Sequence, residues 1–194
     1  MTVSTPAEPI DHDRRRFFGI AAATMAAAQL GGLAAARAAT PKPAPLPPVK
    51  PGTHTSFGAL KQVNAGPLSI GYAEAGPAEG PAVILLHGWP YDIHSYVDVA
   101  PLLAAAGYRV IVPYLRGYGT TRLISAETPR NGQQSVLGVD VIALMDALKI
   151  EKAVLGGYDW GARTADIVAA LWPERVKALV SVSGYLIEIG RAHV

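Results

Sequence analysis

The stretch G-G-Y-D-W-G-A-R, Gly156–Arg163, decides how this chain is expected to fold. It follows an apolar run at Lys152–Leu155 and precedes a run with helical spacing, so it links a buried strand to a helix. The pattern G-x-D-x-G is typical of a turn so tight that side chains at Gly157 or Gly161 would collide with neighbouring backbone. We therefore expect Asp159 to be strained and lifted clear of the sheet, at the amino end of the helix, where the helix dipole favours negative charge.

An aspartate on such a turn suits one kind of chemistry. A carboxylate that attacks an ester gives an anhydride, which is a poor route, whereas attack on a saturated carbon bearing a leaving group gives an alkyl ester that water can hydrolyse. If Asp159 is a nucleophile, its natural substrates are therefore epoxides and alkyl halides. The alternative is that Asp159 is an ordinary helix N-cap.

The rest of the chain alternates between apolar runs and helical spacings. Strands are predicted at Phe57–Val63, Leu68–Ala75, Ala82–Leu86, Tyr108–Pro113, Lys152–Gly157 and Val176–Ser183, and helices at Tyr96–Ala106, Leu137–Leu148 and Thr164–Trp172. This order predicts an α/β fold with two antiparallel leading strands and then a doubly wound, mostly parallel sheet. Ligands of such sheets bind beyond the carboxyl ends of the strands, where the loops H-G-W-P, L-R-G-Y-G and G-Y-D-W-G lie.

These three loops together resemble those of the α/β-hydrolases, in the branch that contains epoxide hydrolases and haloalkane dehalogenases. The motifs are His87-Gly88-Trp89-Pro90, Arg116-Gly117-Tyr118-Gly119 and Gly157-Tyr158-Asp159-Trp160-Gly161, and the resemblance covers roughly residues 55–185. It implies that Asp159 is the nucleophile of a nucleophile elbow and that the backbone amides of Trp89 and Trp160 form an oxyanion hole. Each such amide is typically worth about 3 kcal/mol in catalysis.

The resemblance also implies roles for the other motif residues and for partners. Loop bracing is implied for His87, Gly88, Pro90 and Arg116. Arg116 is expected to form a salt bridge or contacts with carbonyl groups, although family members often have aspartate where this chain has Tyr114. The expected partner is a small-molecule substrate, and no metal or organic cofactor is implied.

The residue before Pro90 separates the two branches. H-G-F-P and H-G-W-P are common in epoxide hydrolases, whereas haloalkane dehalogenases more often have asparagine at the position of Trp89. This favours an epoxide hydrolase. The indole N–H of Trp160 could hold a halide, so a dehalogenase stays open as an alternative. A non-catalytic ligand-binding protein on the same fold is a third possibility, against which the intact loops count.

Family members carry further catalytic parts later in the chain: a histidine, an acid and lid tyrosines. His193 comes too early to be that histidine. The tail Glu188–Val194 reads like a translated sequencing adapter, so we expect it to be non-native and residues 55–187 to be the N-terminal part of the hydrolase domain. On this interpretation the chain as written is inactive.

The first residues predict export. Residues 1–38 combine Arg14, Arg15 and Arg16, an apolar alanine-rich run and a small-residue cleavage site, which resembles a twin-arginine signal peptide. Residues 39–54 form a proline-rich linker. The expected location is therefore periplasmic or secreted, with only transient membrane contact.

Composition excludes several other classes. The net charge of +2 is too small to indicate a nucleic-acid partner. The absence of cysteine excludes disulfides and thiol chemistry. Half of the residues are hydrophobic, which is enough for a large core. The sequence does not set the oligomeric state.

Overall fold

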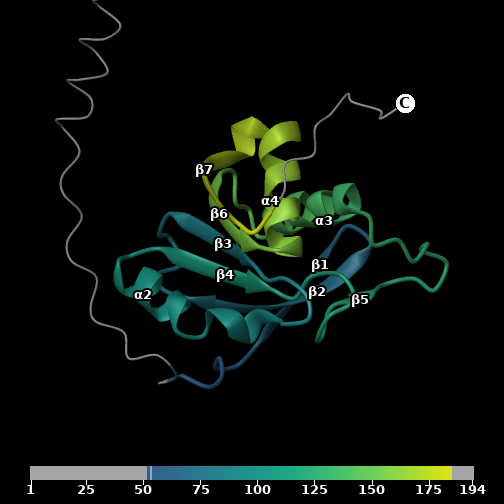
Figure 1. The fold of residues 1–194 in the computed structure, drawn as a ribbon. Coiled ribbons are helices and arrows are strands. Elements are labelled where there is room, and N and C mark those ends of the chain that lie inside the picture. The colour runs from purple at the N-terminus through teal and green to yellow at the C-terminus, as the bar shows by residue number, and fades with distance from the viewer. Residues whose placement is uncertain (1–51, 53, 185–194) are drawn as a thin grey trace, which may run out of the picture. The chain divides into compact units, whose positions relative to one another are not determined.

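The computed structural model describes residues 52 and 54–184 and contains a seven-stranded mixed sheet (Figure 1). The predicted signal peptide at residues 1–38, nearly all of the linker at 39–54 and the tail at 188–194 lie outside the described residues. The strands run in the order β1-β2-β4-β3-β6-β7, and β5 pairs with β2 off this path.

The sheet changes from antiparallel to parallel pairing at β4. The strands are β1 (Lys61–Ala65), β2 (Leu68–Ala75), β3 (Ala82–Leu86), β4 (Arg109–Pro113), β5 (Arg122–Leu123), β6 (Ala153–Tyr158) and β7 (Val176–Val182). The helices are η1 (Ile93–Tyr96), α2 (Val99–Ala105), α3 (Gln134–Ala147), α4 (Trp160–Leu171) and η2 (Pro173–Arg175), of which η1 and η2 are 3₁₀ turns. β2 pairs antiparallel with β1 and β4, whereas β3 pairs parallel with β4 and β6, and β6 with β7. The predicted fold class is confirmed.

Several element boundaries differ from the prediction. β1 begins at Lys61, not at Phe57, and the short strand β5 was not predicted. The helix expected over residues 96–106 is shorter than predicted, because α2 covers only Val99–Ala105. The 3₁₀ turn η1 before it was not predicted; it begins where the carboxylate of Asp92 accepts from the backbone N–H of His94. Helix α4 begins at Trp160, four residues earlier than expected. The bend between β6 and α4 is therefore tighter than the sequence indicates.

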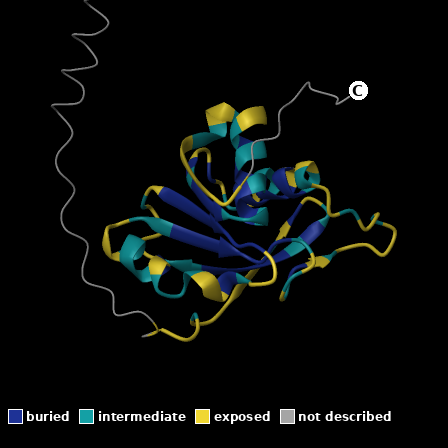
Figure 2. Cartoon of the chain, in the orientation of Figure 1, coloured by how far each residue is buried: buried dark blue, intermediate teal, exposed yellow. Residues whose placement is uncertain are grey.

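Both faces of the central strands are buried, as Figure 2 shows in dark blue. In β3 the side chains of Ile84 and Leu86 join the core that includes residues of α3 and α4. Those of Val83 and Leu85 join the core on the opposite face, where α2 packs (Figure 1). This two-sided burial explains why parallel strands here are continuous apolar runs with no polar alternation.

β7 forms the last strand of the described sheet and is its exposed edge. Its inner neighbour β6 is buried at Ala153 and Leu155, but β7 exposes Leu179, Val180 and Val182. None of the helices within residues 54–184 is long and apolar enough to cross a membrane.

Burial predicts that replacing either of two leucines that are register partners by alanine lowers the free energy of unfolding by different amounts. Leu155 on β6 is 0% exposed and pairs with Leu179 on β7, which is 38% exposed. We expect Leu155→Ala to lower the free energy of unfolding by about 2–5 kcal/mol, because it leaves a cavity in the core. Leu179→Ala, the matched control, should lower it by roughly 1 kcal/mol. Urea denaturation followed by circular dichroism measures both, and equal losses would contradict this account of the core.

Candidate active site

Asp159 alone connects β6 to α4. β6 ends at Tyr158 and α4 begins at Trp160, and Asp159 between them has φ 52° and ψ −117°. A positive φ at a residue other than glycine costs on the order of 1–3 kcal/mol, so the surrounding structure must hold it. The Asp159 N–H donates to the carbonyl of Val182 at 3.0 Å, and its own carbonyl accepts from the Arg163 N–H at 3.1 Å. The predicted strain at the middle of the G-x-D-x-G motif is confirmed.

Close backbone approach explains the glycines of the motif. A Cβ on Gly161 would lie 2.0 Å from the carbonyl oxygen of Leu86, at the end of β3. A Cβ on Gly157 would lie 2.5 Å from the carbonyl carbon of Gly161. Both separations are too short for real atoms, so the predicted steric need for glycine holds at both positions. As a consequence, the first turn of α4 lies directly against the loop that follows β3.

The carboxylate of Asp159 contacts a backbone amide from that loop. Its Oδ1 accepts from the Trp89 N–H at 2.9 Å, and its Oδ2 lies 3.7 Å from Nη2 of Arg163. The side chain is 32% exposed. Although Asp159 occupies the N-cap position of α4, its carboxylate makes no capping hydrogen bond to the helix. The alternative interpretation, in which this side chain caps the helix, is therefore wrong.

The two tryptophans of the motifs come from different elements. Trp89 is 68% exposed, and it contributes its backbone amide to Asp159. Trp160 opens α4, and the guanidinium of Arg163 stacks 4.8 Å from the centroid of its ring. Amides in the first turn of a helix have no acceptor within the helix, which leaves the Trp160 N–H available to a ligand. Arg163 was not singled out in the sequence, although its spacing of four residues from Asp159 places both on one helical face.

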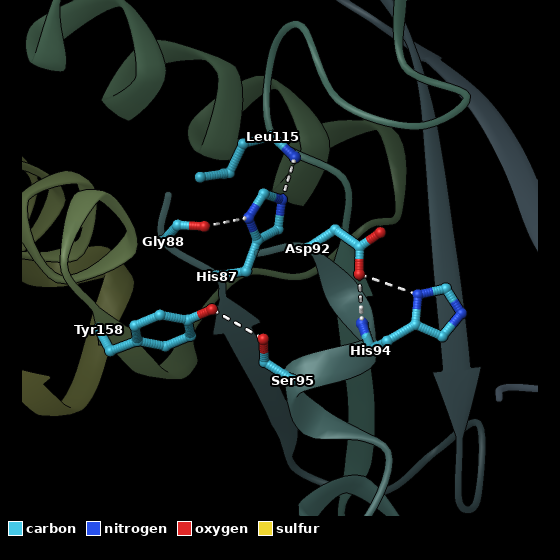
Figure 3. Close-up of polar contacts among 7 residues, drawn as sticks. All are labelled: His87, Gly88, Asp92, His94, Ser95, Leu115 and Tyr158. Carbon is cyan, nitrogen blue, oxygen red and sulfur yellow. Dashed lines mark hydrogen bonds and ion pairs between the residues drawn. The ribbon is translucent and has the colours of Figure 1, made fainter. Parts of the chain in front are cut away.

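His87 is fully buried and joins two loops (Figure 3). Its Nε2 accepts from the Leu115 N–H at 3.1 Å, so Nε2 carries no proton, and the proton on Nδ1 is donated to the Gly88 carbonyl at 3.2 Å. Burial lowers the pKa of this imidazole. The arrangement suits a neutral ring that braces the loops after β3 and β4, and both of its nitrogens are occupied.

Arg116 ties the loop after β4 to helix α3. Its Nε and Nη2 donate to the two carboxylate oxygens of Asp140 at 2.8 and 2.7 Å, in a two-pronged pair that is almost buried. Burial raises the pKa of the Asp140 carboxyl, and the Arg116 guanidinium opposes that rise. The next motif residue, Tyr118, packs edge-on against His87, and burial together with the charge of Asp159 raises the pKa of its phenol.

The loop after β3 has an exposed tip and anchored ends. A Cβ on Gly88 would lie 2.6 Å from the Cβ of Asp159, which requires glycine there. Pro90 follows a cis peptide bond and is exposed, as is Tyr91. Further along, the Ser95 hydroxyl lies 2.8 Å from the Tyr158 hydroxyl (Figure 3). No local pattern in the sequence predicts this contact, which joins residues 63 positions apart.

Figure 3 also shows an Asp92–His94 pair on the same loop. Asp92 Oδ1 lies 2.9 Å from both the backbone nitrogen and Nδ1 of His94. Burial acts to raise the pKa of the Asp92 carboxyl, but the hydrogen bonds from the backbone N–H and the ring of His94 lower it. The pKa of Asp92 therefore lies below its ordinary value. Within the described part of the chain, no group of three or more histidine, cysteine or acidic side chains is arranged to hold a metal ion.

Comparison with known proteins places these features in a family. The family model described as alpha/beta hydrolase fold matches residues 81–193. Epoxide hydrolase 3 of Siraitia grosvenorii is 41% identical over 104 residues, which cover 54% of this chain and 32% of that protein.

Two solved structures are similar as well. One, from Klebsiella pneumoniae and assigned provisionally as an epoxide hydrolase, is 70% identical, with a TM-score of 0.65 and coverage of 66% of this chain and 42% of that one. The epoxide hydrolase VrEH1 of Vigna radiata is 32% identical, with a TM-score of 0.60 and coverage of 66% and 41%. The chain therefore spans less than half the length of each of these relatives.

The buried His87 predicts a pH dependence of stability. Because its pKa in the folded chain lies below the ordinary value of 6.5, the folded chain binds fewer protons than the unfolded chain. Stability should be complete above about pH 6.5 and fall as the pH drops below it towards the folded pKa. The His87→Gln variant should be less stable than the native chain at about pH 7.5. Between about pH 7.5 and about pH 5.5 it should lose less stability than the native chain does, because it has no imidazole to protonate. The midpoints of urea unfolding at the two pH values measure these losses. Equal losses in the native chain and the variant would exclude His87 as the cause of the pH dependence.

Proposed function

This chain belongs to the alpha/beta hydrolase fold family, and from that premise we propose that the protein hydrolyses epoxides through an alkyl ester on Asp159. One observation carries the proposal: the carboxylate of Asp159 stands on a strained bend, makes no capping bond and receives the Trp89 N–H at 2.9 Å. A side chain with a purely structural role would not need this strain. The names of the similar proteins support an epoxide as substrate.

In the first step, Oδ2 of Asp159 attacks an epoxide carbon. A C–O bond forms to Oδ2, the ring C–O bond breaks, and its electron pair goes to the ring oxygen, which takes up a proton to become a hydroxyl group. Oδ1, held by the Trp89 N–H, becomes the carbonyl oxygen of the ester. Oδ2 is the attacking oxygen because its contact with Arg163 is the looser one, at 3.7 Å.

In the second step, water attacks the carbonyl carbon of the Asp159 ester. Negative charge then develops on Oδ1, where the Trp89 amide already points and where the Trp160 amide, in the first turn of α4, would add a second donor. Collapse of the tetrahedral intermediate breaks the bond between the carbonyl carbon and Oδ2, releases the diol and restores the carboxylate, and the proton taken up in the first step returns to solvent. The amide of Trp89 therefore contributes more to the second step than to the first, because charge is gained at Oδ1 only there.

The ester itself provides the test. Incubation with 1,2-epoxyhexane, followed by trypsin, should add the mass of the whole epoxide to the peptide of residues 153–163, which contains Asp159. Asp159→Asn should abolish the adduct, because an amide is a very weak nucleophile. Asp166→Asn, on the same helix, is the matched control and should retain it.

Two outcomes would contradict the proposal. An unlabelled Asp159 peptide in the full-length protein, treated in the same way, would reject Asp159 as the nucleophile. Labelling by 1-chlorohexane with loss of chloride, in the absence of labelling by the epoxide, would assign the site to alkyl halides instead. Circular dichroism of each variant establishes that the loss of an adduct is not a loss of folding.

We also propose that residues 1–38 direct export through the twin-arginine route, a proposal that rests on the sequence around Arg14, Arg15 and Arg16. Changing these three arginines together to lysine preserves the charge, and it should retain the protein in the cytoplasm of a bacterial host that has this route. Arg37→Lys, near the expected cleavage site, is the control and should still be exported. Cell fractionation and immunoblotting measure the result, and unchanged export of the triple variant would exclude the route.

A further inference from the structure

The Trp89 amide lies on a loop whose tip is not held by burial. We call residues 88–95 the donor loop. Its tip exposes Trp89 to 68% and Tyr91 to 65%, so neither side chain fixes the backbone between them by packing. A hydrogen bond as short as the 2.9 Å contact of Trp89 with Asp159 nevertheless requires an accurate backbone position. Something at the ends of the donor loop must provide that position.

Tyr158 contacts the donor loop at both ends. At the first end, Gly88 packs so closely on the Tyr158 ring that an added Cβ would lie 2.8 Å from its Cε2. At the other end, the Ser95 hydroxyl bonds the Tyr158 hydroxyl at 2.8 Å (Figure 3). Tyr158 also directly precedes Asp159 in the chain. One rigid side chain therefore sets the position of the donor loop relative to the bend that carries the carboxylate.

We propose that the Tyr158–Ser95 hydroxyl pair is a positioning device that holds the Trp89 N–H on Oδ1 of Asp159. The ring of Tyr158 sets the start of the donor loop by contact, and its hydroxyl sets the end of the loop by a directional hydrogen bond. With both ends fixed to the residue before Asp159, the amide between them follows any movement of the bend. The importance of this pair for catalysis rests on the proposed function, but its effect on the amide does not.

A second tyrosine on the same 3₁₀ turn provides a matched control. The hydroxyl of Tyr96 donates to the Leu86 carbonyl at 2.8 Å, so it fixes η1 to the end of strand β3 and makes no hydrogen bond to Tyr158 or Ser95. Phenylalanine at this position keeps the ring, whose centroid lies 5.9 Å from that of Tyr158, and leaves the backbone approach of Gly161 to Leu86 in place. Tyr96→Phe and Tyr158→Phe thus each remove one tyrosine hydroxyl and one hydrogen bond of the same length. The two variants differ in the element that the lost hydrogen bond held: Tyr158→Phe removes a bond to the donor loop, and Tyr96→Phe removes a bond to strand β3.

The experiment follows the Trp89 amide by ¹⁵N NMR in the 194-residue chain. In Ser95→Ala and in Tyr158→Phe, the Trp89 amide proton should move upfield and exchange with solvent about 2- to 10-fold faster, as expected for the loss of one ordinary hydrogen bond. The double variant should be no faster than either single variant, because both lose the same bond. Ser95→Thr, which keeps the hydroxyl, should restore the native exchange rate, and Tyr96→Phe should leave it unchanged. An unchanged Trp89 amide in Ser95→Ala and Tyr158→Phe overturns the proposal.

A second readout connects the pair to the chemistry. Hydroxylamine cleaves the Asp159 ester by attack on the same carbonyl carbon, so its rate reports stabilisation of charge on Oδ1. Cleavage should be about 2- to 10-fold slower in Ser95→Ala and Tyr158→Phe than in the native chain, and native in Tyr96→Phe. If the native chain forms no ester, the proposed function fails while the NMR result still decides the role of the pair. If the variants cleave the ester at the native rate while their Trp89 amide exchanges faster, the pair positions the amide but does not contribute to catalysis.

Discussion

The approach of Gly161 to the carbonyl oxygen of Leu86 is the constraint on which the rest of the site depends. A single methyl group at that position would sit 2.0 Å from the oxygen, so no larger residue allows α4 to begin where it does. Because Leu86 ends β3, this contact brings the start of α4 against the loop after β3. The carboxylate of Asp159 and the amide of Trp89 meet as a direct result. The hydrogen bond between them is thus a consequence of backbone packing.

The strain at Asp159 persists because both elements that flank it are firmly held. β6 lies between β3 and β7 in the sheet, and its Leu155 is fully buried. α4 buries Ala165 and Val168 against the core that it shares with α3. Burial of this apolar surface contributes several kcal/mol, which outweighs the order of 1–3 kcal/mol for one strained residue. The bend therefore stays set in the absence of a ligand, with its carboxylate partly exposed.

Two buried braces hold the neighbouring loops in different ways. His87 uses a neutral ring, with one nitrogen as donor and the other as acceptor, to join the loops after β3 and β4. Arg116 and Asp140 use opposite charges to join the loop after β4 to α3. Neither brace contacts Asp159 through a hydrogen bond among the residues that the structure describes. Charge near the bend is thus provided by Arg163 and the amino end of α4, and the braces provide position.

The sequence by itself determined the order of the elements, the fold class and the bend at Asp159. These are local properties: apolar runs mark the strands, helical spacing marks α3 and α4, and G-x-D-x-G marks a bend where only glycine fits. It did not determine the start of α4 at Trp160, because that boundary depends on the close packing of Gly161 against the end of β3 in the folded chain.

Tertiary structure alone decided the partners of the site residues. Asp140 lies 24 residues from Arg116 and Ser95 lies 63 residues from Tyr158, and no local pattern connects either pair. The parallel order of β4, β3 and β6 brings the segments that carry Arg116, Ser95 and Tyr158 to one edge of the sheet, and helix α3 provides Asp140 to Arg116. The physical reason is that a short motif fixes the backbone of a few residues, whereas a hydrogen bond between distant segments requires the packed sheet that aligns them.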